Sequence, residues 1–218
     1  MQVGMATIFQ NPENQISDGE VYRNELRLAN LAEPLGFDSI WGVEHHFTDY
    51  TMCPDVMQFL TYMAGRTKHI KLGSMVVVLP WHDPMRVAEE VSMLDHISEG
   101  RLILGMGRGA GRVEFEGFRV PMDESRERFV EAAQMVLAGL EQGYCEFNGK
   151  HYKQPRADIR PKPEKTFKGR TYDLPVSVVA SVRAGNKIAA IKELRSATGM
   201  DLASAKQVVD RIAALPAP

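Results

Sequence analysis

Residues 71–79 read Lys-Leu-Gly-Ser-Met-Val-Val-Val-Leu and end in a nearly continuous apolar run. A half-exposed strand alternates apolar and polar residues, whereas a continuous apolar run is typical of a strand covered on both faces. Strands of that kind belong to parallel sheets, because the helices that connect parallel strands also cover the sheet. The run therefore predicts a buried parallel strand over Lys71–Leu79.

The segments on both sides of this run alternate between short β-rich stretches and helical ones. The predicted strands are Gln2–Phe9, Ser39–Val43, Lys71–Leu79 and Leu102–Met106. The predicted helices are Glu20–Leu35, a stretch near Asp55–Arg66, a helix opened by Asp83-Pro84, and Asp123–Gln142. Four consecutive β-α units predict an α/β fold with a parallel sheet and helical crossovers. The pattern alone leaves a closed barrel and an open doubly wound sheet both possible.

Local signals mark the ends and faces of these helices. Asp18 is a plausible N-cap of the first helix, and Gly143 closes the fourth, since glycine adopts the left-handed conformation that ends many helices. The helix that Asp83-Pro84 opens carries one predicted buried stripe: Val87, Val91, Leu94 and Ile97.

The regular alternation ends after residue 143. Tyr144–Tyr152 resembles a small hairpin around Asn148-Gly149, and Pro155, Pro161 and Pro163 then mark an extended segment. Pro175–Val182 alternates like a half-buried strand. Asn186 and Asp201 are predicted to cap two helices, whose apolar positions are Ile188, Ile191 and Leu194, then Leu202, Ala205, Val209 and Ile212. We therefore expect a boundary near Tyr172, between a unit of residues 1–172 and a small α+β tail of residues 173–218.

Composition excludes several classes of partner. A formal net charge of -2 gives no general attraction to nucleic acid or to anionic membranes. No apolar run approaches the roughly 20 residues that span a bilayer, and the amino terminus lacks the pattern of a secretory signal. Cys53 and Cys145 lie far apart and outside metal-ligand spacing, which fits a reducing compartment. We expect a cytoplasmic protein that binds neither nucleic acid nor membrane.

Three predicted strands lead into loops with chemically distinctive residues. Glu44-His45-His46-Phe47 follows the second strand, Pro80-Trp81-His82 follows the third, and Gly107–Arg112 follows the fourth. In parallel α/β barrels the active site is built from the loops at the carboxyl ends of the strands. The convergence of these loops on one face predicts a functional site there.

The paired histidines suit acid-base chemistry, because the unperturbed pKa of imidazole lies near neutrality. The alternative reading has His45 and His46 as hydrogen-bonded loop residues without a catalytic role. A metal site made by Glu44, His45, His46 and His82 lacks the helical spacing of known ligand motifs, so we expect no metal.

Glycines alternate through Gly105, Gly107, Gly109 and Gly111. A dinucleotide fingerprint opens a helix directly and follows the first strand of its unit, whereas this run leads into Val113–Phe118, which is predicted to be non-helical. Glycines here instead allow the backbone to approach a flat or phosphorylated ligand, with Arg108 pairing its phosphate. The alternative is a flexible loop with a solvated arginine.

These blocks together resemble the bacterial luciferase-like monooxygenases. The matching blocks, in order, are Gly36–Trp41, Glu44–Phe47, Leu72–Gly73, Val78–Pro80, His82–Pro84, Ala88–Glu90, Leu94–Ser98, Gly100–Leu102, Gly105–Gly109 and Arg160–Pro163. The resemblance covers about residues 1–172.

The resemblance implies a (β/α)8 barrel that binds reduced FMN, or in some branches the deazaflavin F420, and oxidises a small organic substrate. With FMN the oxidant is O2, whereas deazaflavin members transfer hydride. By position, His45 matches the family's acid-base histidine. Met75-Val76 matches the dipeptide, often joined by a cis peptide, on which the flavin ring rests, and Arg108, beside Gly107, matches the arginine that reaches the flavin phosphate. His82 matches a less constant position.

Beyond Tyr172 the family pattern, a fifth strand and three more units, is replaced. Pro175–Ile212 resembles the start of the C-terminal domain of ribosomal stalk protein L7/L12. That resemblance implies contacts with translational GTPases through the matching basic positions Lys187, Lys192, Arg195 and Lys206. We therefore expect a fusion of incomplete TIM-barrel-like (β/α) units with an L7/L12-like tail, and exposed sheet edges that favour a homo-oligomer. The rival reading is a non-catalytic module whose tail recruits a protein partner.

Overall fold

The computed structural model describes residues 1–163, 178, 181–182, 184–198 and 202–214. The chain divides into two compact units, Met1–Lys168 and Gly169–Pro218. The boundary expected after Tyr172 stays a prediction, because residues 164–177 lie outside the described part. None of the helices in the described part is long and apolar enough to cross a membrane.

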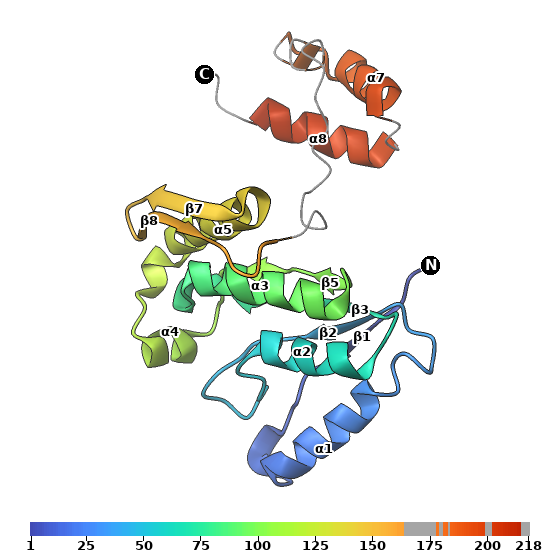
Figure 1. Ribbon diagram of the computed structural model, residues 1–218, viewed down its shortest axis with the longest axis vertical. Helices are drawn as coiled ribbons and strands as arrows, with labels where there is room; N and C mark the ends of the chain where they lie inside the picture. The colour runs from blue at the N-terminus through green and yellow to red at the C-terminus, as the bar shows by residue number, and fades with distance from the viewer. Residues whose placement is uncertain (164–177, 179–180, 183, 199–201, 215–218) are drawn as a thin grey trace. The chain divides into compact units, whose positions relative to one another are not determined.

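The first unit is built on a parallel sheet (Figure 1). Its strand order is β1-β2-β3-β5, and its members are β1 (Gly4–Thr7), β2 (Ser39–Gly42), β3 (Lys71–Ser74) and β5 (Leu102–Ile103). Each neighbouring pair in this order is parallel. A second parallel pair joins β4 (Val77–Val78) to β6 (Met106–Gly107). The α/β class with a parallel sheet, predicted from the sequence, is confirmed.

The predicted strand Lys71–Leu79 is interrupted, which corrects the expectation of one continuous strand. β3 ends at Ser74, the peptide bond between Met75 and Val76 is cis, and β4 then covers only Val77–Val78. The hydroxyl of Ser74 donates to the carbonyl oxygen of Gly105 (2.9 Å) and accepts from its N–H (2.8 Å). This side chain takes the place of backbone ladder bonds, so the predicted strand Leu102–Met106 divides at the same level into β5 and β6.

Four long helices connect and cover these strands: α1 (Asp18–Ala29), α2 (Val56–Arg66), α3 (Pro84–Ser98) and α5 (Ser125–Gln142). Asp83 caps α3 as predicted, because its carboxylate accepts the N–H groups of Met85 and Arg86. Gly143 ends α5 in the left-handed conformation, also as predicted. α1 differs, since Ser17 is its N-cap, Asp18 is already helical, and the helix ends at Ala29 rather than Leu35.

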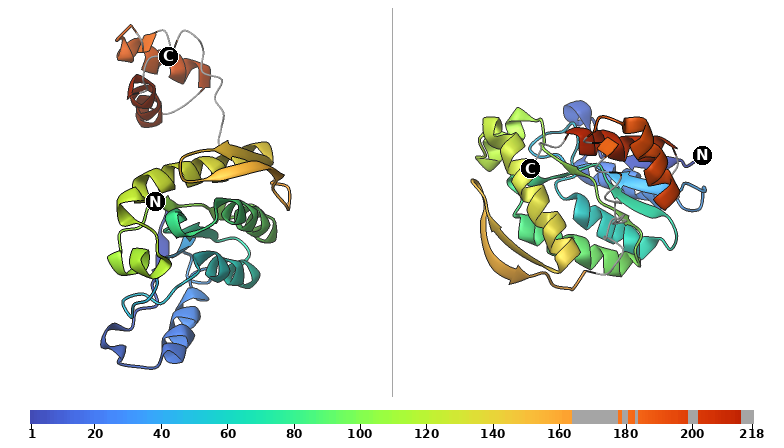
Figure 2. Two further views of the ribbon diagram at one scale, coloured as in Figure 1. Left: turned by 90° about the vertical axis from the view of Figure 1, so that its left-hand side faces the viewer. Right: turned by 90° about the horizontal axis from the view of Figure 1, so that it is seen from above.

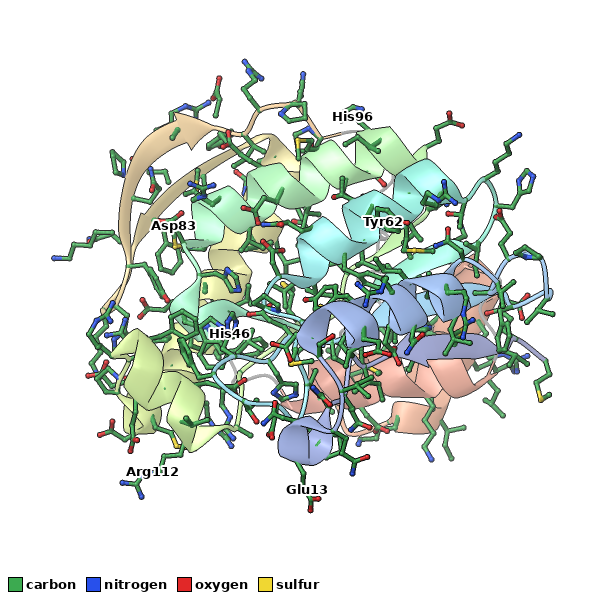
Figure 3. All side chains as sticks on the ribbon, turned by 90° about the horizontal axis from the view of Figure 1, so that it is seen from below. Glu13, His46, Tyr62, Asp83, His96 and Arg112 are labelled. Atoms are coloured by element: carbon green, nitrogen blue, oxygen red, sulfur yellow. The ribbon has the colours of Figure 1, made fainter. Side chains whose placement is uncertain are left out.

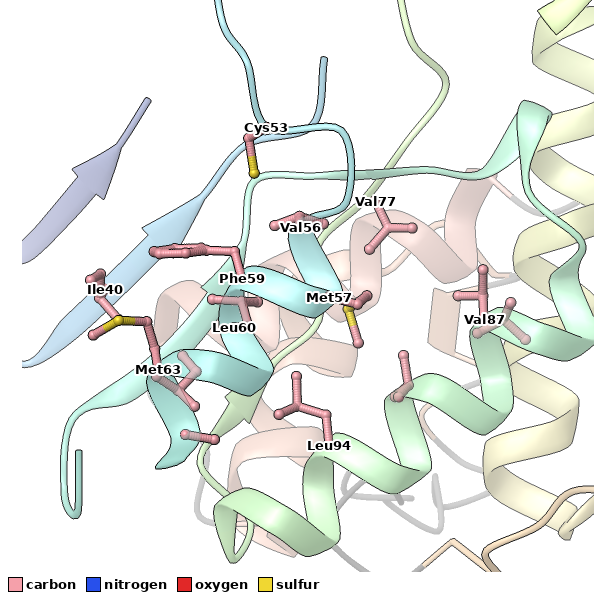
Figure 4. Close-up of a cluster of buried hydrophobic side chains, with 14 of the residues drawn as sticks. Ile40, Cys53, Val56, Met57, Phe59, Leu60, Met63, Val77, Val87 and Leu94 are labelled. Carbon is pink, nitrogen blue, oxygen red and sulfur yellow. The ribbon is translucent and has the colours of Figure 1, made fainter. Parts of the chain in front are cut away.

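The core of this unit lies between the sheet and the helices (Figure 4). Val87, Val91 and Leu94 of α3 are fully buried, as their spacing predicted. Ile97, the fourth member of the predicted stripe, is instead exposed, and Ser98 is buried in its place. Ser98 completes about three helical turns from Val87 and so returns to the inward face, whereas Ile97 stops short of it.

An antiparallel hairpin packs against α5 (Figure 2). Its strands, β7 (Tyr144–Asn148) and β8 (Lys153–Asp158), are longer than the hairpin expected over Tyr144–Tyr152. β8 contains Pro155, which the sequence assigned to an extended segment. Pro155 lies at an irregularity in the pairing register, where its missing N–H removes no ladder bond.

The second unit contains α7 (Lys187–Thr198) and α8 (Leu202–Ala214) around a small core of its own. Asn186 caps α7 as predicted, since its side chain accepts the N–H of Ala189. Asp201, the other predicted cap, lies outside the described residues. Leu202 and Ile188 are exposed, although their spacing predicted burial.

The strand predicted over Pro175–Val182 is wrong at every described position. Val178, Ser181 and Val182 are helical, and the rest of that range lies outside the described residues. Val178 and Val182 are both buried. Residues four positions apart share a face in a helix as well as in a strand, so this short apolar pattern does not distinguish the two.

Candidate functional site

The loops that follow β2, β4 and β6 meet in a hydrogen-bonded cluster, as their positions in the sequence predicted. Figure 3 marks the region by His46, from the loop after β2, with Asp83 at the start of α3 and Arg112 at the start of α4 in view on either side. Two buried carboxylates organise the cluster, Glu44 and Glu114.

Glu44 joins the first two loops. Its Oε1 atom accepts hydrogen bonds from Trp81 Nε1 (2.8 Å) and faces His46 Nε2 (3.2 Å) and His82 Nε2 (2.7 Å). Its other oxygen accepts the N–H of Val78 (3.2 Å), which follows the Met75-Val76 dipeptide. The side chain of Glu44 therefore links the loop after β2 to β4 and to the residues just before α3 through hydrogen bonds.

The electrostatics of Glu44 and His82 follow from this contact. Burial alone would raise the pKa of the Glu44 carboxyl, but hydrogen bonds from His46 and His82 lower it to about 2. Burial alone would lower the pKa of His82, but the hydrogen bond and the charge of Glu44 raise it above its usual value. Among the residues the structure describes, no group of three or more His, Cys, Asp and Glu side chains is placed to hold a metal ion.

Glu114 holds the other histidine. Its Oε1 atom lies 3.0 Å from His45 Nδ1 and also accepts the N–H of His46 at 3.0 Å. The residue is only 3% exposed, whereas the side chain of His45 is 39% exposed. Sequence analysis did not single out Glu114, which the structure brings to His45 from 69 positions along the chain.

Glu114 was missed because its helix was missed. α4 (Arg112–Phe118) covers the stretch predicted to be non-helical. Its stability comes from tertiary contacts, since Phe115 is buried and its ring lies 5.1 Å from that of Trp81. One local signal was available: Arg112 and Glu116 stand four apart and form an ion pair at 2.7 Å.

The helical state of α4 removes one of the two arguments against a dinucleotide fingerprint. A helix does begin directly after Gly111, contrary to the prediction. The other argument stands, because the glycine run follows the last strands of the parallel sheet in chain order rather than the first.

The glycines of this run are required by packing within the protein. A Cβ atom at Gly107 would overlap the Val76 side chain, and one at Gly105 would overlap the Ser74 carbonyl oxygen. A Cβ at Gly111 would overlap Glu114 Oε2. Gly109 has a positive φ of 78° and faces Trp81 and Val78. The absence of a side chain at Gly107 therefore leaves space for Val76, part of the dipeptide that is predicted to support the flavin ring.

Met75 and Val76 lie between the end of β2 on one side and the segment that joins β5 to β6 on the other. The N–H of Met75 donates to Gly42 O at the end of β2 (2.7 Å), and that of Val77 donates to Gly105 O (2.9 Å). The Met75 side chain is about half exposed. The dipeptide thus presents an accessible apolar surface between the strand that leads to His45 and the strand that leads to Arg108.

Arg108 is exposed at the end of β6. Its Nη1 atom donates to the hydroxyl of Ser125 (3.1 Å), the first residue of α5. Ser125 is buried and was not among the residues identified from sequence. The guanidinium is accessible and lies beside the first residue of a long helix.

His46 differs from His45 in its surroundings. Its ring packs edge-on against those of Phe118 (4.6 Å) and Trp81 (5.9 Å), and its side chain is 11% exposed. Its Nε2 atom is occupied by Glu44. The structure therefore separates the adjacent histidines into one enclosed ring and one accessible ring.

The model of the luciferase-like monooxygenase family matches residues 1–217. The chain belongs to this family. The match includes residues 175–212, for which the resemblance to L7/L12 stays a prediction.

Curated relatives in the luciferase-like family include the alkanal monooxygenase alpha chain of Photorhabdus luminescens, 33% identical over 70% of this chain and 42% of its own length. Another is the oxygenase component of the flavin-dependent trigonelline monooxygenase of Acinetobacter baylyi, 30% identical over 75% of this chain and 46% of its own. The chain spans less than half the length of these two relatives.

Solved structures agree with this assignment. Monooxygenase RslO1 from Streptomyces bottropensis superposes with a TM-score of 0.72 at 28% identity, covering 100% of this chain and 68% of that one. The oxygenating constituent of 3,6-diketocamphane monooxygenase from Pseudomonas putida, solved with FMN, gives 0.67 at 18% identity, covering 96% and 63%. At that identity the likeness concerns the fold alone.

Proposed function

We propose that this chain provides the flavin site of a luciferase-like oxidoreductase that uses reduced FMN and O2 to oxidise a small organic substrate. The observation that carries the proposal is the position of Met75-Val76. The N–H of Met75 donates to Gly42 O in the strand leading to His45, and the N–H of the next residue, Val77, donates to Gly105 O just before the strand leading to Arg108. Met75-Val76 suits the flavin ring, His45 its reacting edge and Arg108 its phosphate. These three groups thus follow strands β3, β2 and β6 of the first unit, respectively.

The chemical character of these residues fits FMN. The apolar side chains of Met75 and Val76 suit a flat ring, and the exposed guanidinium of Arg108 suits a phosphate dianion through charge-assisted hydrogen bonds. Gly107 has no side chain, and this leaves the space that the Val76 side chain occupies. When bound, reduced flavin supplies the electrons for oxygen activation, and the protein orients it and excludes water.

His45 is the proposed acid-base group. Its ring is partly exposed, and within the described residues its Nε2 atom has no hydrogen-bond partner. An imidazole in this state can accept a proton at Nε2 from a bound molecule and return it later in the cycle.

The proposed architecture is TIM-barrel-like. It is supported by the hydrophobic core of the first unit, to which α1, α2, α3 and α5 all contribute buried residues. In such barrels the site lies at the carboxyl ends of the strands, where the three loops meet here.

F420 is the alternative cofactor. A solved F420-dependent secondary alcohol dehydrogenase shares the fold at a TM-score of 0.61 and 20% identity. A deazaflavin enzyme transfers hydride and needs no O2, so the two cofactors predict different requirements. We prefer FMN, because the relatives above 30% identity include an alkanal monooxygenase.

The proposal is tested by titrating the purified chain with FMN and with F420 and following flavin fluorescence. The FMN-loaded protein is then photoreduced without air and mixed with O2 and a panel of small aldehydes, ketones and amines. Product formation that requires both reduced FMN and O2 supports the proposal. Binding of F420 alone, or of neither cofactor, contradicts it.

We keep a protein-binding module as the second candidate function. It is supported by the C-terminal unit, which has its own core and exposes Ile188 on α7. Of the basic positions that match L7/L12, Lys187 is paired with Asp210 at 2.8 Å, whereas Lys192 remains a candidate contact. Calorimetric titration with a purified translational GTPase tests it, with Lys192→Glu as the variant and Lys68→Glu in the first unit as the control. Equal behaviour of both variants contradicts it.

A further inference from the structure

We infer that Glu114 is the positioning residue for His45: it fixes which ring nitrogen carries the proton and thereby presents Nε2 to the bound reactants. The inference rests on the proposed function of His45 and adds a residue that neither motif nor resemblance indicated. His45 and His46 are adjacent in the loop after β2, and each contacts a buried carboxylate, but one contact is closed to solvent and the other is open.

The closed contact is that of Glu44. It binds His46 through Nε2, the nitrogen farther from the backbone, and the His46 ring is enclosed by aromatic side chains. With Nε2 engaged, His46 offers no outward-facing nitrogen at its tip. This contact holds the loop in position. The histidine available for proton transfer is therefore His45.

The open contact is that of Glu114. It binds His45 through Nδ1, so Nε2 at the tip of the ring stays accessible. Glu114 Oε1 also accepts the backbone N–H of His46, and a carboxylate offers only acceptors. The His45 nitrogen that faces this oxygen is therefore the donor, which leaves the lone pair of the neutral ring on Nε2.

Glu114 is held firmly enough to impose this state. It is 3% exposed, and the next residue in α4, Phe115, is buried against Trp81. Gly111 leaves the space that the second carboxylate oxygen occupies, because any Cβ there would overlap Oε2. The missing side chain at Gly111 is thus a requirement of the Glu114–His45 pair, since its backbone conformation alone does not call for glycine.

The chemical consequence is a defined path for one proton. A proton leaves the bound donor and joins Nε2, the Nδ1 proton stays in its bond to Glu114, and the imidazolium that results is stabilised by the adjacent carboxylate. Return of the Nε2 proton restores the starting state. Without Glu114, both neutral tautomers are populated, and the tautomer with the proton on Nε2 cannot accept.

The test reads the tautomer directly. The chain is labelled with 15N-histidine, and long-range 1H–15N spectra are recorded without flavin, with the signal of His45 among the six histidines assigned from His45→Gln. We compare Glu114→Gln with Glu116→Gln, an exposed control on the same helix. The expected result is a fall of about tenfold in the Nδ1–H to Nε2–H ratio for Glu114→Gln, since a neutral acceptor binds less strongly than a charged one. Glu116→Gln leaves the ratio unchanged.

Gly111→Ala provides a second, independent variant, because it displaces the Glu114 carboxylate while retaining its charge. It is expected to shift the tautomer ratio in the same direction.

An unchanged ratio in folded Glu114→Gln overturns the inference. In turnover, Glu114→Gln is expected to lower kcat while the affinity for FMN is kept, and a shifted tautomer with unchanged kcat also overturns it. Failure of the unsubstituted chain to bind FMN contradicts the proposed function instead. The 1H–15N spectra, which are recorded without flavin, still test the pairing of Glu114 with His45.

Discussion

At the scale of single residues, the site depends on which atoms of neighbouring side chains remain available. Arg108 has an accessible guanidinium that donates a hydrogen bond to the hydroxyl of Ser125. His45 keeps Nε2 open, whereas His46 is enclosed. Adjacent residues of the same type therefore acquire different chemistry from their surroundings.

Arg108→Ala is expected to weaken FMN binding by about 10- to 100-fold and riboflavin binding far less. A hydrogen bond to a charged group contributes roughly 1.5–3 kcal/mol, and riboflavin lacks the phosphate that accepts it. Fluorescence titration with both ligands measures the difference. Arg112→Ala is the matched control, since Arg112 is exposed and paired with Glu116. Equal losses of FMN and riboflavin would rule out the phosphate contact.

His45→Ala is expected to lower turnover by about 100-fold or more, the usual range for a positioned acid-base group. FMN binding should persist, because the proposed ring support and phosphate contact come from Met75-Val76 and Arg108. Single-turnover oxidation of the reduced, FMN-loaded protein separates the chemical step from binding. An unchanged rate would return His45 to the structural reading that the sequence left open.

At the scale of elements, buried polar contacts join segments that are far apart in the chain. Glu44 connects the end of β2 to Val78 at the end of β4 and to His82 just before α3. Ser74 bonds across to Gly105 and separates β3 from β4. α4 is seated by Phe115 and Glu114. The site is thus assembled by contacts between elements rather than within any one of them.

Folding stability is expected to depend on pH through the Glu44–His82 contact. The pKa of His82 is raised above 6.5, so its contribution to the free energy of unfolding is fully present below that pH and is lost as pH rises through the raised value. The pKa of Glu44 falls from 4.5 to about 2, so its contribution is present above 4.5 and is lost as pH falls toward 2.

Urea unfolding between pH 5 and 9, a range of about four units chosen to span the His82 transition, measures this dependence. His82→Gln is expected to lower the free energy of unfolding by roughly 1–3 kcal/mol at the acid end. The difference between the two proteins should shrink as the pH rises. A constant difference across the range would show that His82 stabilises through packing rather than charge.

At the scale of the whole molecule, the first unit carries features that favour self-association. α2 and α3 pack together and expose large apolar side chains, among them Tyr62, Met93 and Ile97. β1 and β5 are the outer strands of the described parallel sheet, and each has one unpaired side there. Exposed apolar patches and strand edges are typical sites of contact with another chain.

We therefore expect a homo-oligomer, with a molar mass by light scattering that rises above the monomer value with concentration. Ile97→Lys is expected to shift the equilibrium toward monomer, because it places a charge on the exposed face of α3. Leu28→Lys, on the exposed face of α1, is the control. A monomer at every concentration, or equal effects of both variants, would contradict self-association through the exposed apolar residues of α2 and α3.

Local patterns in the sequence predict the sheet class, the order of the β-α units, the ends of several helices and the loops that meet at the candidate site. These properties follow from local patterns, such as the apolar run in Lys71–Leu79 and the capping role of Asp83. Local patterns also failed where two structures share them, as at Val178 and Val182, which are helical rather than extended.

Three features depend instead on tertiary contacts: which histidine is open, where the strand after Ser74 breaks, and the presence of α4. His45 and Glu114 lie 69 positions apart, and their hydrogen bond forms only because β2 and the segment after β6 come together. Burial and pairing of this kind depend on the folded positions of distant residues, which no periodicity along the chain records. The protonated nitrogen of His45 is set by such a contact, and the proposed chemistry of the site therefore depends on the fold as a whole.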